Sequence, residues 1–293
     1  TFRRLGLSYL VLKRPDFDKF AGADYSIAFD AWNPDGRVNQ IGTVHNLGEN
    51  FAKAFEITYE DVDGARRNVA QTCYGFGISR TLAAVIAQHG DDHGMILPPE
   101  IAPIQVVIVP IPYKEHEKEV NAYAGEVYRE IVDAGLRAHL DEEDKTPGEK
   151  FYHWEIFGVP VRVEVGPKDL NERRITLSER VSLKRITVPF EETVSAIKEL
   201  FVTLAKELEA RSRSTLKNVT VKADGMDALK KAIRSKKIAR VCWCEREECA
   251  EMIKNTSTGE IRGHRIDMSE RPESPCIICG RKAKRVVYVA RAY

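Results

Sequence analysis

The chain has 293 residues, of which 43% are hydrophobic and 30% are charged. This is the balance of a soluble globular protein, and the length suits two or three domains better than one. No apolar run approaches the ~20 residues of a membrane span, and there is no signal peptide, so we expect a cytoplasmic protein without a membrane segment. Thr1 is not an initiator methionine, and we expect a longer parent protein.

Charge is distributed unevenly along the chain, although the formal net charge is only +1. From Glu209 onward there are 20 Lys and Arg residues against 11 Asp and Glu, whereas the first 208 residues carry 25 against 33. A basic tail on an acidic body suits an anionic partner such as RNA, but Lys-rich solvated helices produce the same pattern. Charge alone leaves both interpretations open.

The first hundred residues are predicted to form antiparallel strands closed by one long helix. Apolar and polar residues alternate, with Tyr25, Ile27 and Phe29 on one face, as in a half-buried strand. Turn residues follow, so the next strand is expected to return antiparallel. The pattern predicts an α+β layer. Its expected elements are strands at 25–30, from 38 and at 68–74, and a helix that follows Gly77.

A proline-rich segment at residues 98–103 is expected to end this region, because proline breaks regular structure and stiffens a linker. Apolar strands then alternate with amphipathic helices, one of which has Thr146 as its N-cap and Pro147 at its first position. The alternation predicts an α/β domain with three layers around a mostly parallel sheet. Its expected elements are strands at 105–111, 136–140 and 159–165, and helices at 120–134, 147–158 and 194–208.

The last region repeats the order strand, helix, strand on a smaller scale and ends on a strand. We therefore predict a small α/β domain at the C-terminus. Its expected elements lie at 219–222, 227–234, 238–243 and 285–293. The three domains are expected to cover residues 1–103, 104–210 and 211–293.

Five of the six cysteines follow residue 240, and four of them form two pairs, Cys244 with Cys249 and Cys276 with Cys279. Without an export signal, such clustering indicates a metal site rather than a disulfide framework. Four thiolates form a closed tetrahedral site, the pattern of structural zinc, although reduced thiols without a metal would have the same spacing. Cys242 is expected on the same side of its strand as Cys244, but it lacks the turn that a ligand pair needs.

Tyr74-Gly-Phe-Gly-Ile-Ser-Arg80 stands at a strand-to-helix junction. Its glycines let the backbone approach a ligand, the helix N-terminus offers free N–H groups to phosphate, and Arg80 adds a planar fork for phosphate oxygens. A tight turn with a surface arginine would produce the same string. The neighbouring Cys73 is expected to be a small buried residue rather than a nucleophile.

Gln40-Ile-Gly-Thr-Val-His45 lies in the second expected strand. Thr43 and His45 are two residues apart and so face the same side, where a hydroxyl and an imidazole can hold a small polar ligand. Gln40 falls on the opposite face unless Gly42 carries a bulge or the strand starts late. The alternative is a polar edge that faces solvent.

Several strings together resemble the prolyl-tRNA synthetases of the archaeal and eukaryotic type, which are class IIa aminoacyl-tRNA synthetases. The resemblance covers essentially the whole chain, and it implies the C-terminal part of an antiparallel class II catalytic core, an α/β anticodon-binding domain and a zinc-bearing tail. The strings are Lys19-Phe-Ala-Gly-Ala-Asp-Tyr25, residues 40–48, Gln71-Thr-Cys-Tyr-Gly-Phe-Gly-Ile-Ser-Arg80, residues 89–99, 146–155 and 158–169, and the terminal Tyr293.

The resemblance implies a role for individual residues. Arg80 stands where the third class II signature places an arginine on the ATP γ-phosphate, and His45 falls beside the proline pocket, so these are the candidate catalytic residues. Activation needs positioning and charge neutralisation by Arg and Mg²⁺ rather than a protein nucleophile. The implied ATP ligands are Gln40, Thr43, Gly75, Gly77 and Arg80, and the implied proline ligands are Gly22, Asp24 and His45.

In the second region the resemblance implies that Glu155, Arg162, Lys168 and Asp169 read the two guanines of the proline anticodon. Arginine suits the O6 and N7 edge of guanine, and a carboxylate accepts from guanine N–H groups. Anticodon bases are unstacked, so these edge contacts are feasible. The alternative for Arg162 is an ion pair with Glu164 on an exposed sheet face.

The expected activity is ATP-dependent ligation of L-proline to tRNA(Pro) through a prolyl-adenylate, by a homodimer with one structural zinc per chain. The family's second signature lies upstream of Thr1, so this polypeptide alone is expected to be inactive. The alternatives are a catalytically silent tRNA-binding fragment or paralogue, and another class IIa synthetase, threonyl or glycyl. In the family the terminal carboxylate, here on Tyr293, is directed toward the catalytic domain.

Overall fold

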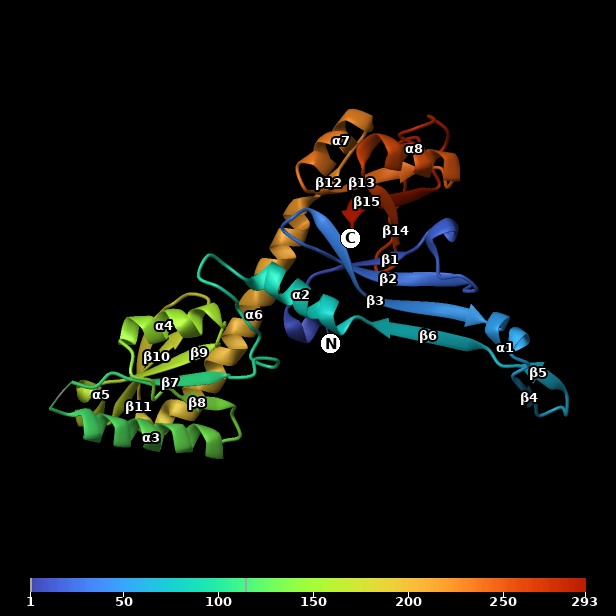
Figure 1. Cartoon of the computed structure of the whole chain (residues 1–293). Helices are drawn as coiled ribbons and strands as arrows, with labels where there is room; N and C mark the ends of the chain where they lie inside the picture. Colours follow the sequence, from blue (N-terminus) through green and yellow to red (C-terminus); the bar gives the residue numbers. More distant parts are fainter. Residues whose placement is uncertain (1, 114) are drawn as a thin grey trace. The chain divides into compact units, whose positions relative to one another are not determined.

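The computed structural model describes residues 2–113 and 115–293, which divide into two compact units (Figure 1). Unit 1 contains the chain up to residue 7 and residues 85–212, and unit 2 contains residues 8–84 and 213–293. Each unit therefore combines segments that are distant in the sequence. Within the described ranges, no helix is both long and apolar enough to cross a membrane.

Unit 1 is built on a sheet whose described strands have the order β11-β10-β9-β7-β8. β7 pairs parallel with β8 and β9, whereas β10 pairs antiparallel with β9 and β11. The prediction of a mostly parallel sheet is wrong for β10 and β11, because they form a hairpin that needs no crossover helix. The strands are β7 (Val106–Pro110), β8 (Ala138–Leu140), β9 (Val161–Val165), β10 (Arg174–Glu179) and β11 (Arg185–Pro189).

Helices cover both faces of this sheet, as the three-layer prediction requires (Figure 1). α3 and the N-terminal part of α6 pack on one face, and α4 packs on the other through Phe151 and Trp154. Thr146 caps α4 in a capping box with Glu149, as the sequence predicts. The helices are α2 (Ile78–His89), α3 (Glu117–Asp133), α4 (Pro147–Ile156), α5 (Pro167–Asn171) and α6 (Thr193–Val219), with short 3₁₀ turns at Phe2–Leu5 and Phe190–Glu192. The unit boundaries fall within α2 and α6, so each helix contributes residues to both units.

The segment before and through the prolines packs within unit 1. Asp91 accepts two hydrogen bonds from the buried guanidinium of Arg180, at 3.0 and 2.7 Å, which lower the pKa of Asp91 to about 2. Arg180 also donates to the backbone carbonyl of Glu155, in the last turn of α4. The amide of Met95 donates to the carbonyl of Ile156 at 3.0 Å. These contacts tie the segment to the second face of the sheet.

Unit 2 is built on a sheet whose described strands have the order β12-β13-β15-β14-β1-β2-β3-β6. β2 and β3 pair antiparallel, as predicted. β15 also pairs with β3, so β15, β14, β1, β2 and β3 close into a ring made from both ends of the chain. The strands are β1 (Leu10–Lys13), β2 (Tyr25–Trp32), β3 (Arg37–Gly48), β6 (Gln71–Phe76), β12 (Thr220–Lys222), β13 (Ile238–Trp243), β14 (Glu260–Arg265) and β15 (Arg285–Ala292).

The remaining elements of unit 2 surround this sheet. α7 and α8 follow β12 and β13 and contribute Leu229 and Ile253 to a core that they share with β13 and β15. β4 and β5 form a separate hairpin. These elements are α1 (Asn50–Ala54), α7 (Met226–Arg234), α8 (Glu247–Ser257), β4 (Thr58–Glu60), β5 (Arg66–Asn68) and a 3₁₀ turn at Asp16–Asp18.

Burial along β2 is the reverse of the sequence expectation. Ser26, Ala28 and Asp30 are buried, whereas the apolar residues between them, from Tyr25 to Phe29, are only partly covered. The polar side can be buried because Ser26 and Asp30 are hydrogen-bonded to neighbouring segments, which removes the cost of taking them out of water.

Candidate functional site

A bulge in β3 brings Gln40, Thr43 and His45 to one face of the sheet. The three residues pair with alternate residues of β2, which point to the same side of that strand. The register shifts next to Gln40, where Ile41 has no partner of its own. The bulge that the sequence required for Gln40 to join this face is therefore present, with Ile41 rather than Gly42 as the extra residue.

His45 is held by two residues that sequence reasoning did not single out. Its Nδ1 lies 2.7 Å from the hydroxyl of Ser26, and its ring packs on Phe20 with a centroid distance of 4.8 Å. The hydroxyl of Ser26 accepts from the amide of Phe20, so its own proton is free to be donated to Nδ1. Burial lowers the pKa of His45, which favours the neutral imidazole.

The loop with Gly22 and Asp24 lies beside His45 in the same unit. The side-chain amide of Asn50 donates to the carbonyl of Gly22 at 3.1 Å and to Asp24 Oδ1 at 3.2 Å. Gly22 has φ +83°, and a Cβ there would lie 2.9 Å from the ring of Phe51. Glycine is therefore required at this position, and the loop holds its shape through Asn50.

The glycine-rich junction lies across β3 from this loop. Gly75 pairs with Thr43, and a Cβ on Gly75 would lie 2.7 Å from Thr43 Oγ1. Gly77 ends the strand, and Arg80 occupies the first turn of α2 with an exposed side chain. The amide of Asn39 donates to the Arg80 carbonyl at 2.9 Å. In residues 2–113 and 115–293, no carboxylate pairs with the Arg80 guanidinium.

Cys73 is exposed, which corrects the expectation of a buried residue. β6 is the edge strand of the sheet, and most of its residues are exposed in this chain. Cys73 pairs with His45 across the strands and so shares the face of the candidate site.

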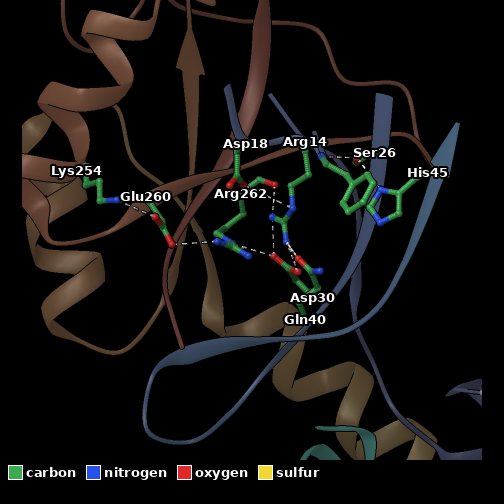
Figure 2. Close-up of polar contacts among 10 residues, drawn as sticks. Arg14, Asp18, Ser26, Asp30, Gln40, His45, Lys254, Glu260 and Arg262 are labelled. Atoms are coloured by element: carbon green, nitrogen blue, oxygen red, sulfur yellow. Dashed lines mark hydrogen bonds and ion pairs between the residues drawn. The ribbon is translucent and has the colours of Figure 1, made fainter. Parts of the chain in front are cut away.

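The side chain of Gln40 is hydrogen-bonded to a group of buried charged residues (Figure 2). Its side-chain carbonyl accepts from the guanidinium of Arg14 at 2.5 Å, and Arg14 is paired with the fully buried Asp30. Arg262 of β14 donates to the same Asp30 carboxylate. The sequence signal for this group is Asp30, an acidic residue on the side of β2 that otherwise carries the small residues Ser26 and Ala28.

The four predicted metal ligands come together in unit 2. The sulfur atoms of Cys244, Cys249, Cys276 and Cys279 all lie within 4.8 Å of one another, and Cys244 Sγ is 3.7 and 3.6 Å from those of Cys249 and Cys279. A tetrahedral zinc with Zn–S bonds of ~2.3 Å requires sulfur separations of ~3.8 Å. Burial raises the pKa of the Cys249 thiol, whereas a backbone hydrogen bond from Arg281 lowers that of Cys279 to about 7.

Cys242 lies apart from these four sulfurs. It packs in a small apolar cluster with Ala283 and Val286. The expectation that Cys242 shares the strand side of Cys244 is therefore wrong, because Cys244 packs in a different cluster, with Cys249 and Cys276.

In unit 1, Arg162 and its partners form a buried ion-pair group. Arg162 donates to Glu155 at 2.9 Å and to Glu164 at 3.1 Å, and its guanidinium lies 3.9 Å from the ring centroid of Phe151. The ion pair between Arg162 and Glu164 that the alternative expected is therefore present. Its placement on an exposed face is wrong, because the two residues are only 8% and 6% exposed. α4 covers this face, which is why β9 is buried on both sides.

Lys168 and Asp169 lie at an open cavity of about 880 Å³ between β9 and α5. Asp169 accepts from the amide of Gly166 at 3.0 Å, which fixes the start of α5, and Lys168 is exposed. Glu164 also lines the cavity, and Arg162 does not. The four predicted anticodon residues therefore form two pairs. Arg162 is buried and pairs with the partly buried Glu155, whereas Lys168 and Asp169 line the cavity, and Glu164 contacts both Arg162 and the cavity.

Three family models match consecutive parts of the chain. The model described as "tRNA synthetase class II core domain (G, H, P, S and T)" matches residues 1–89. The model described as "Anticodon binding domain" matches residues 105–200, and the model described as "Prolyl-tRNA synthetase, C-terminal" matches residues 226–293.

Curated relatives match along the whole chain. The protein named proline–tRNA ligase of Pyrococcus abyssi is 45% identical over 99% of this chain and 61% of its own length. Those of Thermofilum pendens and Methanococcoides burtonii are 44% and 41% identical over 100% of this chain and 61% and 60% of their own lengths. The chain thus spans about three fifths of the length of the curated relatives it matches.

Proposed function

We propose, from the premise that this chain belongs to the prolyl-tRNA synthetase family, that it is the C-terminal part of an enzyme that ligates L-proline to tRNA(Pro) with ATP. The observation that carries the proposal is the convergence of Gln40, Thr43, His45 and Gly75 on one face, with Arg80 at the adjoining helix start. A protein that only bound tRNA would have no use for this arrangement.

The proposed ATP ligands are Gln40, Thr43, Gly75, Gly77 and Arg80. Gly75 and Gly77 keep side chains away from the surface beside Thr43, which supports close approach of a nucleotide. Arg80 lies in the first turn of a helix, where negative charge is stabilised, and no carboxylate of the described residues pairs with its guanidinium. Magnesium ion would neutralise phosphate charge when bound, and Arg80 would contribute the protein's share of that stabilisation.

The proposed proline ligands are Gly22, Asp24 and His45. Asp24 accepts a hydrogen bond from Asn50 and belongs to a loop with a required glycine, so contacts within the chain define the conformation of this loop. The neutral His45, anchored through Ser26, offers an Nε2–H donor rather than a positive charge. Such a donor suits a small polar substrate without competing for its carboxylate in an ion pair.

For the anticodon, we propose that the cavity beside α5 receives the bases. Lys168 and Asp169 supply a donor and an acceptor there, and Glu164 adds a second acceptor. Glu155 and Arg162 contribute through their buried ion pairs, because Arg162 orients the Glu164 carboxylate. All four predicted residues thus take part in anticodon recognition. Lys168 and Asp169 contact the bases, and Glu155 and Arg162 orient Glu164.

For the cysteine cluster we propose one structural zinc per chain. The sulfur separations fit tetrahedral coordination, and four protein thiolates leave no open position for substrate. Zinc binding would release protons from the buried thiols and tie α8 to the loop that carries Cys276 and Cys279. Clustered cysteines that bind a metal instead of forming disulfides are typical of a reducing compartment, which supports a cytoplasmic location.

We also propose that the enzyme is a homodimer. β6 and the start of α2 expose apolar side chains, including Tyr74 at 73% and Ile78 at 78%. Exposed apolar surface of this kind is usually covered by further chain or by a partner subunit. Sedimentation velocity of the full-length product should give twice the monomer mass, and a monomer would refute the dimer.

The test of the proposed function is ATP–pyrophosphate exchange by the full-length gene product with each amino acid in turn. We expect exchange with proline and transfer to tRNA(Pro) only. Exchange driven by threonine or glycine would indicate another class IIa synthetase, and tRNA binding without exchange would indicate a silent paralogue.

A further inference from the structure

The buried charges behind Gln40 form a linked group within unit 2 (Figure 2). Arg14 follows β1, Asp30 lies in β2 and Arg262 lies in β14, so the group joins strands from both ends of the chain. Arg14 makes two hydrogen bonds to Asp30, at 3.1 and 2.8 Å, and Arg262 makes one at 3.0 Å. Arg14 also donates to the backbone carbonyl of Arg262 at 2.6 Å.

Burial of these groups is nearly complete. Asp30 is 0% exposed, and the side chains of Arg14 and Arg262 are 3% and 10% exposed. Asp18 and Glu260, at the edge of the group, pair with Arg14 and Arg262 respectively. Lys254 pairs with Glu260, so three carboxylates stand against three positive charges. A buried ionic group is rarely worth more stability than an apolar replacement, so its main contribution is a fixed geometry.

The buried ionic group fixes the orientation of the Gln40 side chain. The guanidinium nitrogen of Arg14 that donates to Asp30 Oδ1 also donates to Gln40 Oε1. With its carbonyl oxygen occupied in this way, Gln40 presents its amide nitrogen as the remaining polar group. Among the described residues nothing accepts from that nitrogen, so it is available to an acceptor on the face shared with Thr43 and His45.

We propose that Arg262, acting through Asp30 and Arg14, is a positioning residue for Gln40 and thereby tunes ATP binding from the C-terminal segment. Gln40 then donates to an acceptor nitrogen or oxygen of the nucleoside. The inference rests on the proposed function, because it assumes that Gln40 faces ATP. It adds a link that neither segment could form alone, since β14 belongs to the last third of the sequence and Gln40 to the first fifth.

The test uses the full-length enzyme with Arg262→Lys, which keeps the charge but loses the planar fork that orients Asp30 and Arg14. We expect KM for ATP in pyrophosphate exchange, and Kd for ATP by calorimetry, to rise about tenfold, the effect of one charge-assisted hydrogen bond. KM for proline and the zinc content should stay within about twofold of wild type. Arg265→Lys is the matched control, since Arg265 lies on the same strand but pairs with Asp267.

A double-mutant cycle separates positioning from general destabilisation. If Arg262 acts through Gln40, the effect of Arg262→Lys on ATP affinity should disappear in a Gln40→Ala background. Unchanged ATP affinity in Arg262→Lys, or an equal effect with and without Gln40, would overturn the inference. Absence of proline-dependent exchange in the wild-type enzyme would instead refute the proposed function.

Discussion

At the scale of single residues, the polar groups of the candidate site differ in what holds them. His45 and Gln40 are hydrogen-bonded by side chains from neighbouring segments, Ser26 and Arg14. The Arg80 side chain is exposed, and among residues 2–113 and 115–293 the hydrogen bond that a side chain makes to Arg80 is from Asn39 to its backbone carbonyl. An exposed arginine can turn toward a phosphate with little loss of packing. Arg80 can therefore be replaced without disturbing the fold.

Arg80→Ala in the full-length enzyme should reduce proline-dependent pyrophosphate exchange by about 10²-fold or more, since one charge-stabilising donor contributes ~3 kcal/mol. The affinity for tRNA and the thermal unfolding midpoint should be unchanged. Arg66→Ala, an exposed arginine of the β4–β5 hairpin, is the control and should leave exchange intact. Exchange by Arg80→Ala at the wild-type rate would remove Arg80 from the ATP site.

His89 gives a pH dependence to the stability of unit 1. Its Nε2 donates to the carbonyl of Leu5 at 2.8 Å, its ring is buried, and burial lowers its pKa below the ordinary 6.5. The folded chain thus favours neutral His89, and its stability is full above the unfolded pKa and is lost as pH falls toward the folded pKa.

Urea unfolding of this chain should therefore give a lower free energy of unfolding at pH 5.5 than at pH 7.5. His89→Gln should flatten that difference, and His93→Gln, an exposed neighbour, should not. An identical pH dependence in wild type and His89→Gln would contradict the assignment.

At the scale of elements, β9 shows that the alternation of residue types predicts which side chains share a face, but not which faces are buried. Alternation predicts that Val159, Val161, Val163 and Val165 share one face and that Arg162 and Glu164 share the other. This is correct within β9, whereas Val159, which lies before the strand, packs in the cluster of Phe151 and Trp154 on the second face. The alternation in β9 does not by itself show that α4 covers the second face, because that face carries the polar residues Arg162 and Glu164. Helices on both faces follow instead from the three-layer prediction for the whole domain.

β10 and β11 have no counterpart among the predicted strands. Their apolar–polar alternation covers only a few residues, Ile-Thr-Leu-Ser in β10 and Ile-Thr-Val in β11, and charged residues or a proline stand at their ends.

The cavity beside α5 gives the prediction at this scale. Lys168→Ala should raise KM for tRNA(Pro) in aminoacylation by about 10-fold, as loss of one base contact costs ~1–3 kcal/mol. Proline activation without tRNA should be unaffected. Arg129→Ala, an exposed arginine on α3, is the matched control. Equal charging of a transcript with an altered anticodon would contradict the role of this cavity.

At the scale of the whole molecule, unit 2 depends on both ends of the chain. The strand ring closes only when β14 and β15 pair with β1 and β3, and the ring core combines Leu12 and Val38 with Tyr288. The hydroxyl of Tyr293 donates to Asp35 in the β2–β3 turn at 2.8 Å. Loss of structure in the C-terminal segment should therefore reach the strands that carry the candidate site.

Metal removal tests this dependence. The purified protein should contain about one zinc per chain, and Cys249→Ser should lower the thermal unfolding midpoint by roughly 5 °C or more. Cys242→Ser, which changes a buried cysteine outside the cluster, should retain zinc. Substoichiometric metal in wild type, together with an unchanged midpoint in Cys249→Ser, would refute the zinc proposal.

Local patterns in the sequence were sufficient to predict most helices and strands, the N-cap at Thr146 and the clustering of four cysteines. Each of these depends on spacing over a few residues, or on a ligand type whose chemistry is specific. The motif strings also placed Gln40, Thr43, His45 and Arg80 in one candidate site. The three-domain division stays a prediction beside the two compact units.

The tertiary structure alone decided which faces are buried and which distant segments meet. Asp30, on the polar side of β2, is buried because Arg14 and Arg262 satisfy its charge, and Arg262 lies 232 residues away. The bulge at Ile41, which brings Gln40 to the site, follows from the register of two paired strands. The sequence offered a bulge, at Gly42, only as one of two ways in which Gln40 could reach this face. Contacts of this kind depend on which strands pair, and strand pairing is a property of the folded chain as a whole.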